Sequence, residues 1–224
     1  LVEAWRGVGV VGDRLHLAGV MDAEEDRVTV AYLADCAQQA GFAAEMIDVA
    51  EIGVTAAGDF VDLRDRPITT LFKLYPWEFM VREQYGTSLL RRTTRIIEPA
   101  WKMVLSNKGL LALLWEMFPG HPNLLPAFFD GSGHGLAQPY VRKPLLSREG
   151  ANVEIVGLLG AEGGPYGAEG HVVQQYAPLP RFDGNYPVIG SWVVAGEPAG
   201  MGIREDTSPV TRNTSRFIPH FIRD

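Results

Sequence analysis

The amino-acid sequence predicts an α/β fold, and three observations support this prediction. Residues 14–20, 22–40 and 43–52 read as strand, helix and strand, which is the pattern of a parallel sheet with a crossing helix. Residues 140–146 and 153–158 read as two strands joined by a polar loop that contains glycine. Hydrophobic residues make up 46% of the chain and charged residues 21%, which is typical of a globular protein with a buried core.

Composition argues against several classes of partner. The 224 residues carry a formal net charge of −7 and contain no long basic run, so nucleic acids and anionic membranes are disfavoured as partners. No apolar run approaches the ~20 residues needed to span a bilayer. The one cysteine, Cys36, cannot form an internal disulfide, which favours a reducing, cytoplasmic location. Cys36 lies in a helical apolar pattern and is expected to be a buried filler.

The first predicted helix has recognisable ends. Asp22 is placed to cap it, and Glu24 and Glu25 follow in the first turn, where carboxylates complement the helix dipole. Gly41 is placed to end the helix. Because no GxGxxG motif accompanies this unit, a dinucleotide site is not predicted.

Two domains are expected, a small α/β unit over residues 1–95 and a second domain over residues 96–224. Further helices are predicted over 78–85 and 110–118. Further strands are predicted at 58–63, 68–74, 95–99, 171–177, 186–195 and 199–204. The segments 130–136 and 147–170 are predicted to contain mobile loops.

Lys108 is the first residue with a candidate function. It lies at the start of the helix over 110–118, directly after Ser106 and Asn107, either of which could cap that helix. A cation alone is unfavourable at a helix N-terminus, because the dipole there is already positive. A bound anion would make both features favourable together, whereas a solvent-facing lysine is the alternative interpretation.

Lys143 is the second candidate, 35 residues further along. It lies on the strand over 140–146, just before the loop that contains Glu149 and Gly150. A cation next to free backbone N–H groups suits a bound polyphosphate, but a solvated surface hairpin is an equally good interpretation of this stretch alone. Two lysines from different elements can clamp a nucleoside triphosphate.

No metal site is predicted in this chain. The sequence contains no Walker A, HExxH or CxxC motif, and its five histidines are scattered. Glu205 and Asp206 are adjacent, so on a strand their side chains point to opposite faces.

Several blocks of the sequence resemble the glutathionylspermidine synthase family, in particular its bacterial members that lack the amidase half. Among these blocks are LFKLYPWEF, YVRKPLLSREGANVEIV and GMGIREDTSPVTRNTSRFIPHF, and the resemblance runs over residues 15–221. It implies an ATP-grasp fold, with a pre-ATP-grasp-like unit over residues 1–95 and the nucleotide-binding ATP-grasp lobes over residues 96–224. It also implies an ATP-dependent ligase that joins a carboxylate to an amine. In that chemistry ATP phosphorylates the carboxylate, and the amine then displaces phosphate from the acyl phosphate.

The resemblance also implies roles for individual residues. Lys108 and Lys143 match the two lysines that bind the ATP phosphates, and Glu149 and Gly150 fall in the loop that covers them. Arg204 matches an arginine that stabilises the transferred phosphoryl group. The matches on the adenine side of the nucleotide are Gln174, Gln175, Tyr176 and Ala177. Glu24 matches a carboxylate that holds a peptide-like substrate.

Two departures from the family pattern are expected to matter. Phe79 stands where the glutathione-using enzyme has a small hydroxyl residue, which argues against glutathione itself as the acid. The family's Mg²⁺ ligands are expected upstream of Leu1, so the chain is interpreted as the C-terminal part of the enzyme. A nucleotide-binding module without ligase activity and a purely structural domain are the alternative functions.

Overall fold

The computed structural model describes residues 1–10 and 14–223. The chain divides into two compact units, Leu1–Met103 and Val104–Asp224. The division falls eight residues after the boundary expected from the sequence. Within the described residues, no helix is both long and apolar enough to cross a membrane.

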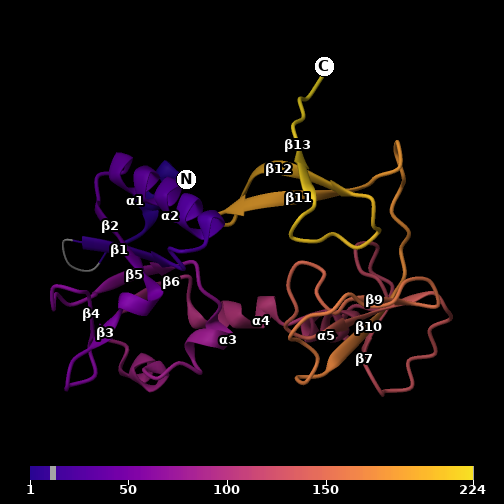
Figure 1. The fold of residues 1–224 in the computed structure, drawn as a ribbon, viewed down its shortest axis with the longest axis horizontal. Helices are drawn as coiled ribbons and strands as arrows, with labels where there is room; N and C mark the ends of the chain where they lie inside the picture. The colour runs from indigo at the N-terminus through magenta and orange to yellow at the C-terminus, as the bar shows by residue number, and fades with distance from the viewer. Residues whose placement is uncertain (11–13, 224) are drawn as a thin grey trace. The chain divides into compact units, whose positions relative to one another are not determined.

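Unit 1 is built on a parallel sheet with the strand order β2-β1-β5-β6. The strands are β1 (Arg14–Gly19), β2 (Ala43–Asp48), β5 (Thr70–Lys73) and β6 (Arg95–Ile97). Helix α2 (Glu24–Gln39) connects β1 to β2 (Figure 1). The predicted strand–helix–strand pattern is therefore confirmed, and Gly41 follows the helix with a φ of +98°.

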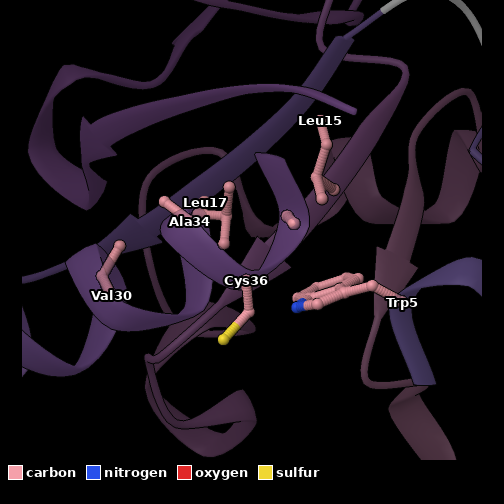
Figure 2. Close-up of a cluster of buried hydrophobic side chains, with 7 residues drawn as sticks. Trp5, Leu15, Leu17, Val30, Ala34 and Cys36 are labelled. Atoms are coloured by element: carbon pink, nitrogen blue, oxygen red, sulfur yellow. The ribbon is translucent and has the colours of Figure 1, made fainter. Parts of the chain in front are cut away.

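The core of unit 1 lies between α2 and the sheet. Leu15 and Leu17 of β1 are completely buried against Val30 and Ala37 of α2. Figure 2 shows Cys36 on the same helix, beside the indole of Trp5. Cys36 is buried, as the apolar pattern around it predicted. A second cluster, which includes Phe60, packs around other residues of the sheet.

The remaining elements of unit 1 are short. They are α1 (Val2–Gly7), η1 (Val49–Glu51), β3 (Gly53–Val54), β4 (Phe60–Val61), α3 (Trp77–Met80), η2 (Gly86–Arg91) and η3 (Ala100–Lys102), with α4 (Met103–Ser106) at the division between the units. The helix predicted over 78–85 ends at Met80. The backbone of Gly86 approaches the carbonyl of Val81 so closely that an added Cβ would lie 2.6 Å from it, so the chain turns back where a helix would continue.

The prediction that Asp22 caps α2 is wrong. The N-cap position is Ala23, which makes no side-chain hydrogen bond. The loop before the helix is held instead by Asp26, which accepts from the Val20 N–H at 3.1 Å, and by Asp48, which accepts from the Met21 N–H at 2.7 Å.

Unit 2 contains helix α5 and a four-stranded antiparallel sheet in the order β7-β10-β8-β9. The helix is α5 (Gly109–Met117), and the strands are β7 (Ala127–Phe129), β8 (Tyr140–Pro144), β9 (Glu154–Val156) and β10 (His171–Gln175). Helix α5 packs against β7 and β10 (Figure 1). The predicted strand–loop–strand over 140–158 is confirmed as the antiparallel pair β8 and β9.

A second antiparallel sheet completes unit 2. It consists of β11 (Tyr186–Val194), β12 (Glu197–Asp206) and β13 (Arg216–Ile218) in that order. The two residues between β11 and β12, Ala195 and Gly196, both have positive φ, as the tight turn of a two-residue hairpin requires. The mixed α/β class predicted from the sequence is therefore confirmed.

A buried carboxylate stabilises the loop that follows β4. Burial alone would raise the pKa of Asp62, but hydrogen bonds from the Arg66 side chain, from the N–H groups of Arg66 and Arg64, and from His16 hold it well below its usual range. A depressed carboxyl pKa stabilises the folded state above the ordinary Asp pKa, and this stabilisation is lost as the pH falls.

We expect Asp62→Asn to lower the free energy of unfolding by about 2 kcal/mol at neutral pH, because charge-assisted hydrogen bonds are lost. Urea denaturation at pH 7 and pH 2 measures the effect, and the difference between wild type and variant should be smaller at pH 2, where the stabilisation is being lost. The matched control is Asp65→Asn, since Asp65 is exposed in the same loop. Equal stabilities for the two variants would contradict the role given to Asp62.

Candidate nucleotide site

Lys108 is held at the junction of α5 and β8. Its backbone N–H donates to the carbonyl of Leu145 at 2.8 Å, which ties the start of the helix to the end of the strand. Lys108 itself is the N-cap residue, while the side chain of Asn107 accepts from the Gly109 N–H at 2.8 Å. The prediction that Ser106 or Asn107 is the N-cap is therefore wrong, although the Asn107 side chain still contacts the first residue of the helix.

Lys143 lies on the face of the sheet against which α5 begins. It is paired directly with Val172, which is paired on its other side with Phe129, so the three side chains share one face. A Cβ added at Gly109 would lie 3.1 Å from the ring of Phe129. The N-terminus of α5, and with it Lys108, therefore lies on the same side of the sheet as Lys143.

Both ammonium groups are hydrogen-bonded to neutral oxygens. The Nζ of Lys143 donates to the Oε1 of Gln174 at 2.7 Å. The Nζ of Lys108 donates to the Oγ of Ser147 at 3.1 Å and to the carbonyl of the same residue. Gln174 and Ser147 are buried, whereas both lysines are half-buried. These hydrogen bonds do not neutralise the positive charge of either lysine, although the carboxylate of Glu169 acts on Lys108.

The pKa values of both lysines are lowered. Burial and the charge of Lys108 together lower the pKa of Lys143 to about 8. The pKa of Lys108 is also lowered, by burial and by Arg148, while Glu169 opposes the change. Because the charge on one lysine affects the ionisation of the other, the two ammonium groups share one electrostatic site. Such a site favours a polyanionic ligand.

The loop between β8 and β9 lies next to this site. Glu149 and Gly150 both have positive φ, 50° and 77°, and the side chain of Glu149 is exposed. A Cβ at Gly150 would lie 2.6 Å from the carbonyl oxygen of Thr211, so the loop packs closely against the segment that follows β12. Its third residue, Ser147, is the partner of Lys108. The loop therefore connects the lysine site to that segment.

Arg204 lies on β12 and is hydrogen-bonded to the segment that follows this strand. Its guanidinium donates to the carbonyls of Arg212 at 2.7 Å, Asn213 at 3.1 Å and Ser215 at 3.3 Å. It also lies 4.9 Å from the ring centroid of Phe217. Its Nε is buried and has no hydrogen-bond partner among the described residues. Because carbonyls are neutral acceptors, the charge of Arg204 remains available to an anion.

The four residues expected on the adenine side differ in their surroundings. The side chain of Gln174 points to the lysine face, whereas Gln175 is exposed and its N–H donates to the Pro126 carbonyl at 2.8 Å. Tyr176 and Ala177 follow the last residue of β10. Lys108, Lys143 and Gln174 therefore lie on the same side of the sheet, and Lys143 is hydrogen-bonded to Gln174. Gln175, Tyr176 and Ala177 lie at the end of β10.

Two other sequence candidates belong to unit 1. Glu24 is exposed in the first turn of α2, where its carboxylate complements the helix dipole. Phe79 lies on α3 with its ring edge-on to Tyr75, at 5.9 Å between centroids. Glu24 therefore remains a predicted substrate-binding residue.

A family comparison identifies the kind of protein to which these residues belong. Residues 1–223 match the family described as glutathionylspermidine synthase, pre-ATP-grasp. The chain belongs to the glutathionylspermidine synthase family. Because this family description names a pre-ATP-grasp region, the prediction that the chain is the C-terminal part of the enzyme is wrong.

Curated relatives in the family are amide-forming synthetases by name. A protein of Haemophilus influenzae provisionally named an acid–amine ligase is 47% identical over 92% of this chain. The trypanothione synthetase of Crithidia fasciculata is 29% identical over 97% of the chain, and the bifunctional glutathionylspermidine synthetase/amidase of Escherichia coli is 27% identical over 92%. The chain spans 56%, 37% and 38% of the lengths of these proteins, respectively.

The fold also resembles a solved structure. The D-cycloserine synthetase DcsG aligns with a TM-score of 0.50 and 19% identity, over 85% of this chain and 67% of that structure. At this identity the similarity concerns the fold alone, and it supports the ATP-grasp-type α/β architecture that the family resemblance implied.

Among the described residues of unit 1, one group of side chains has metal-binding chemistry. Ligand atoms of His16, Glu45 and Asp62 lie within 4.8 Å of one another. However, Arg66 forms ion pairs with both carboxylates, at 2.5 Å and 2.6 Å, and Arg14 pairs with Glu45 at 2.7 Å. The guanidinium groups of Arg66 and Arg14 already neutralise the two carboxylates. In addition, His16 offers a nitrogen, whereas Mg²⁺ prefers oxygen ligands. These residues therefore do not fit the Mg²⁺ that the family resemblance implies.

Sequence reasoning missed two residues around Lys108. Ser147 was recognised only as part of a polar loop, and Glu169 was not singled out, although it accepts from the N–H groups of Leu146 and Gly167 and opposes the lowered pKa of Lys108. A serine four residues after a strand lysine is too common a pattern to have identified either residue.

Proposed function

We propose that this chain is part of an ATP-dependent carboxylate–amine ligase and carries its nucleotide-phosphate site. The observation that supports this most strongly is the pair Lys108 and Lys143, two cations from different elements on one face of a sheet with neutral hydrogen-bond partners. A polyphosphate would supply the negative charge that this site lacks. The family relatives, which are named as amide-forming synthetases, support the reaction class.

The proposed reaction proceeds through an acyl phosphate. The γ-phosphoryl group of ATP is transferred to the carboxylate, ADP leaves, and the amine nitrogen attacks the acyl carbon and expels phosphate. In this scheme Lys108 and Lys143 hold the phosphates, and Arg204 stabilises charge on the transferred group. Tyr176 and Ala177, which follow the last residue of β10, offer backbone groups to the adenine, while the N–H of Gln175 before them is already bonded to Pro126. ATP with Mg²⁺ is the proposed cofactor, although the cluster of His16, Glu45 and Asp62 does not fit the metal.

The proposed substrates are a peptide-like acid and a polyamine-like amine. Glu24, exposed at the N-terminus of α2, is the proposed contact to the acid. By the family resemblance, Phe79 stands where the glutathione-using enzyme has a small hydroxyl residue, which argues against glutathione itself. We therefore infer that the acid is a peptide other than glutathione.

The test is release of ADP in the presence of candidate acids and polyamines. We expect ADP release to require both substrates, because the amine completes the turnover of the acyl phosphate. Calorimetric titration with ADP checks nucleotide binding separately. Absence of any binding of ATP or ADP in the presence of Mg²⁺ would contradict the proposal.

A nucleotide-binding module without ligase activity is the second candidate function. It is favoured by the Arg66 and Arg14 ion pairs that neutralise the one metal-type cluster among the described residues. This candidate predicts thermal stabilisation by ADP without amine-dependent turnover. Amine-dependent turnover would exclude it.

A further inference from the structure

The side chain of Gln174 has a role that its place at the adenine-side strand did not suggest. It is 8% exposed, and its neighbours across the sheet are Ala127 on one side and Val141 on the other. A primary amide in such apolar surroundings requires hydrogen-bond partners, because an unpaired buried polar group costs about 1–3 kcal/mol. Its Oε1 accepts from the Nζ of Lys143 at 2.7 Å.

The sheet register explains why these two side chains meet. Lys143 is directly opposite Val172, and Gln174 lies two residues further along the same strand, so both side chains are on the face where α5 begins. The diagonal neighbour is within reach of a long side chain. Gln174 therefore fixes the direction of the Lys143 ammonium from within the sheet.

The chemical nature of this partner is significant. A carboxylate at the same position would hold the ammonium equally well but would cancel its charge. An amide oxygen orients the ammonium and leaves the positive charge available. The other charged groups around the pair are Lys108 and Arg148, with Glu169 acting on Lys108.

We propose that Gln174 is a positioning residue that acts through Lys143: its neutral side chain holds the ammonium in place for a polyphosphate without neutralising it. This inference rests on the proposed nucleotide-phosphate function of Lys143. It assigns Gln174 a side-chain role, distinct from the backbone contacts with adenine proposed for the residues that follow it.

The first measurement needs no nucleotide. The pKa of Lys143 is followed by NMR of the lysine side chains in wild type, Gln174→Glu, Gln174→Leu and Gln175→Glu. In Gln174→Glu we expect this pKa to rise by about 1–3, because a carboxylate replaces the amide beside the ammonium. In Gln174→Leu we expect it to fall below the wild-type value, because the ammonium loses its acceptor. Gln175→Glu adds the same charge at an exposed neighbour and should leave the pKa almost unchanged.

The second measurement is ADP binding by calorimetry between pH 6.5 and 9.5. Wild-type affinity should decrease as the pH rises through about 8, because Lys143 loses its proton there. Gln174→Glu should weaken ADP binding at pH 7 by about tenfold and remove most of this pH dependence, since its ammonium stays protonated. Gln174→Leu should also weaken binding, with a pH dependence displaced to lower pH.

Two results would overturn the inference. One is a Lys143 pKa that responds equally to Gln174→Glu and Gln175→Glu, or that does not move in Gln174→Leu. The other is wild-type ADP affinity in both Gln174 variants. If wild type binds no ADP while the Lys143 pKa moves as expected, the positioning of Lys143 stands and the nucleotide function fails, so the two claims are separated.

Discussion

Lys143→Met is expected to weaken ADP binding by about 10- to 150-fold, the effect of losing a charge-assisted hydrogen bond of about 1.5–3 kcal/mol. Methionine retains much of the apolar length of lysine, so packing beside Val172 on the α5 face should be preserved. Folding should be unimpaired, because the variant removes a cation that burial destabilises. Calorimetric titration with ADP at pH 7 measures the change.

The matched control for this variant is Lys102→Met. Lys102 pairs with Glu98 at 2.8 Å in unit 1, where the glutamate is exposed. Its removal takes the same charge from the chain and should leave ADP binding unchanged. Unaltered ADP affinity in Lys143→Met, or an equal loss in both variants, would contradict a specific role of Lys143.

Gly150→Ala is expected to destabilise the fold by about 3 kcal/mol, which combines the cost of a positive φ with that of overpacking. The φ of Gly150 is +77°, and the new Cβ would lie 2.6 Å from the Thr211 carbonyl oxygen and 2.9 Å from the side chain of Val210. The loop or the segment after β12 must move to relieve this overlap. ADP binding should weaken as well, because the loop carries Ser147, the partner of Lys108.

Gly120→Ala separates the two contributions. Gly120 has the same φ of +77°, but no atom lies within 4 Å of an added Cβ. This control should therefore lose about 1 kcal/mol, from the backbone conformation alone. Urea denaturation of both variants gives the comparison. Equal destabilisation would show that the contact between Gly150 and Thr211 has no energetic importance.

The sequence predicted the helices and strands whose positions depend on neighbouring residues in the chain. The apolar spacing of α2 and the glycine after it located that helix, because helix periodicity and a left-handed C-terminus are properties of neighbouring residues. The β8–loop–β9 pair was recognised in the same way. Asp22 does not occupy the N-cap position, which is Ala23, and the loop before α2 is held by Asp48 from the next strand, which accepts from the Met21 N–H. Such a long-range hydrogen bond has no signal in the local sequence.

The cationic residues of the candidate site could be predicted from the sequence, but the residues that accept their hydrogen bonds could not. Lys108 and Lys143 stood out through their places beside a helix start and a glycine-containing loop. The partnership of Lys143 with Gln174 depends on the register between β8 and β10, which are separated by a long connection. The carbonyl partners of Arg204 likewise depend on the return of the chain after β12. Both arrangements are set by tertiary packing.

The most direct test of the shared lysine site is an ADP titration followed by NMR of the lysine side chains. Resonances of Lys108 and Lys143 would be assigned with Lys108→Arg and Lys143→Arg. Both resonances are predicted to shift together, with one common dissociation constant, because one polyphosphate contacts both ammonium groups. A titration in which ADP binds while either resonance stays unchanged would contradict the claim.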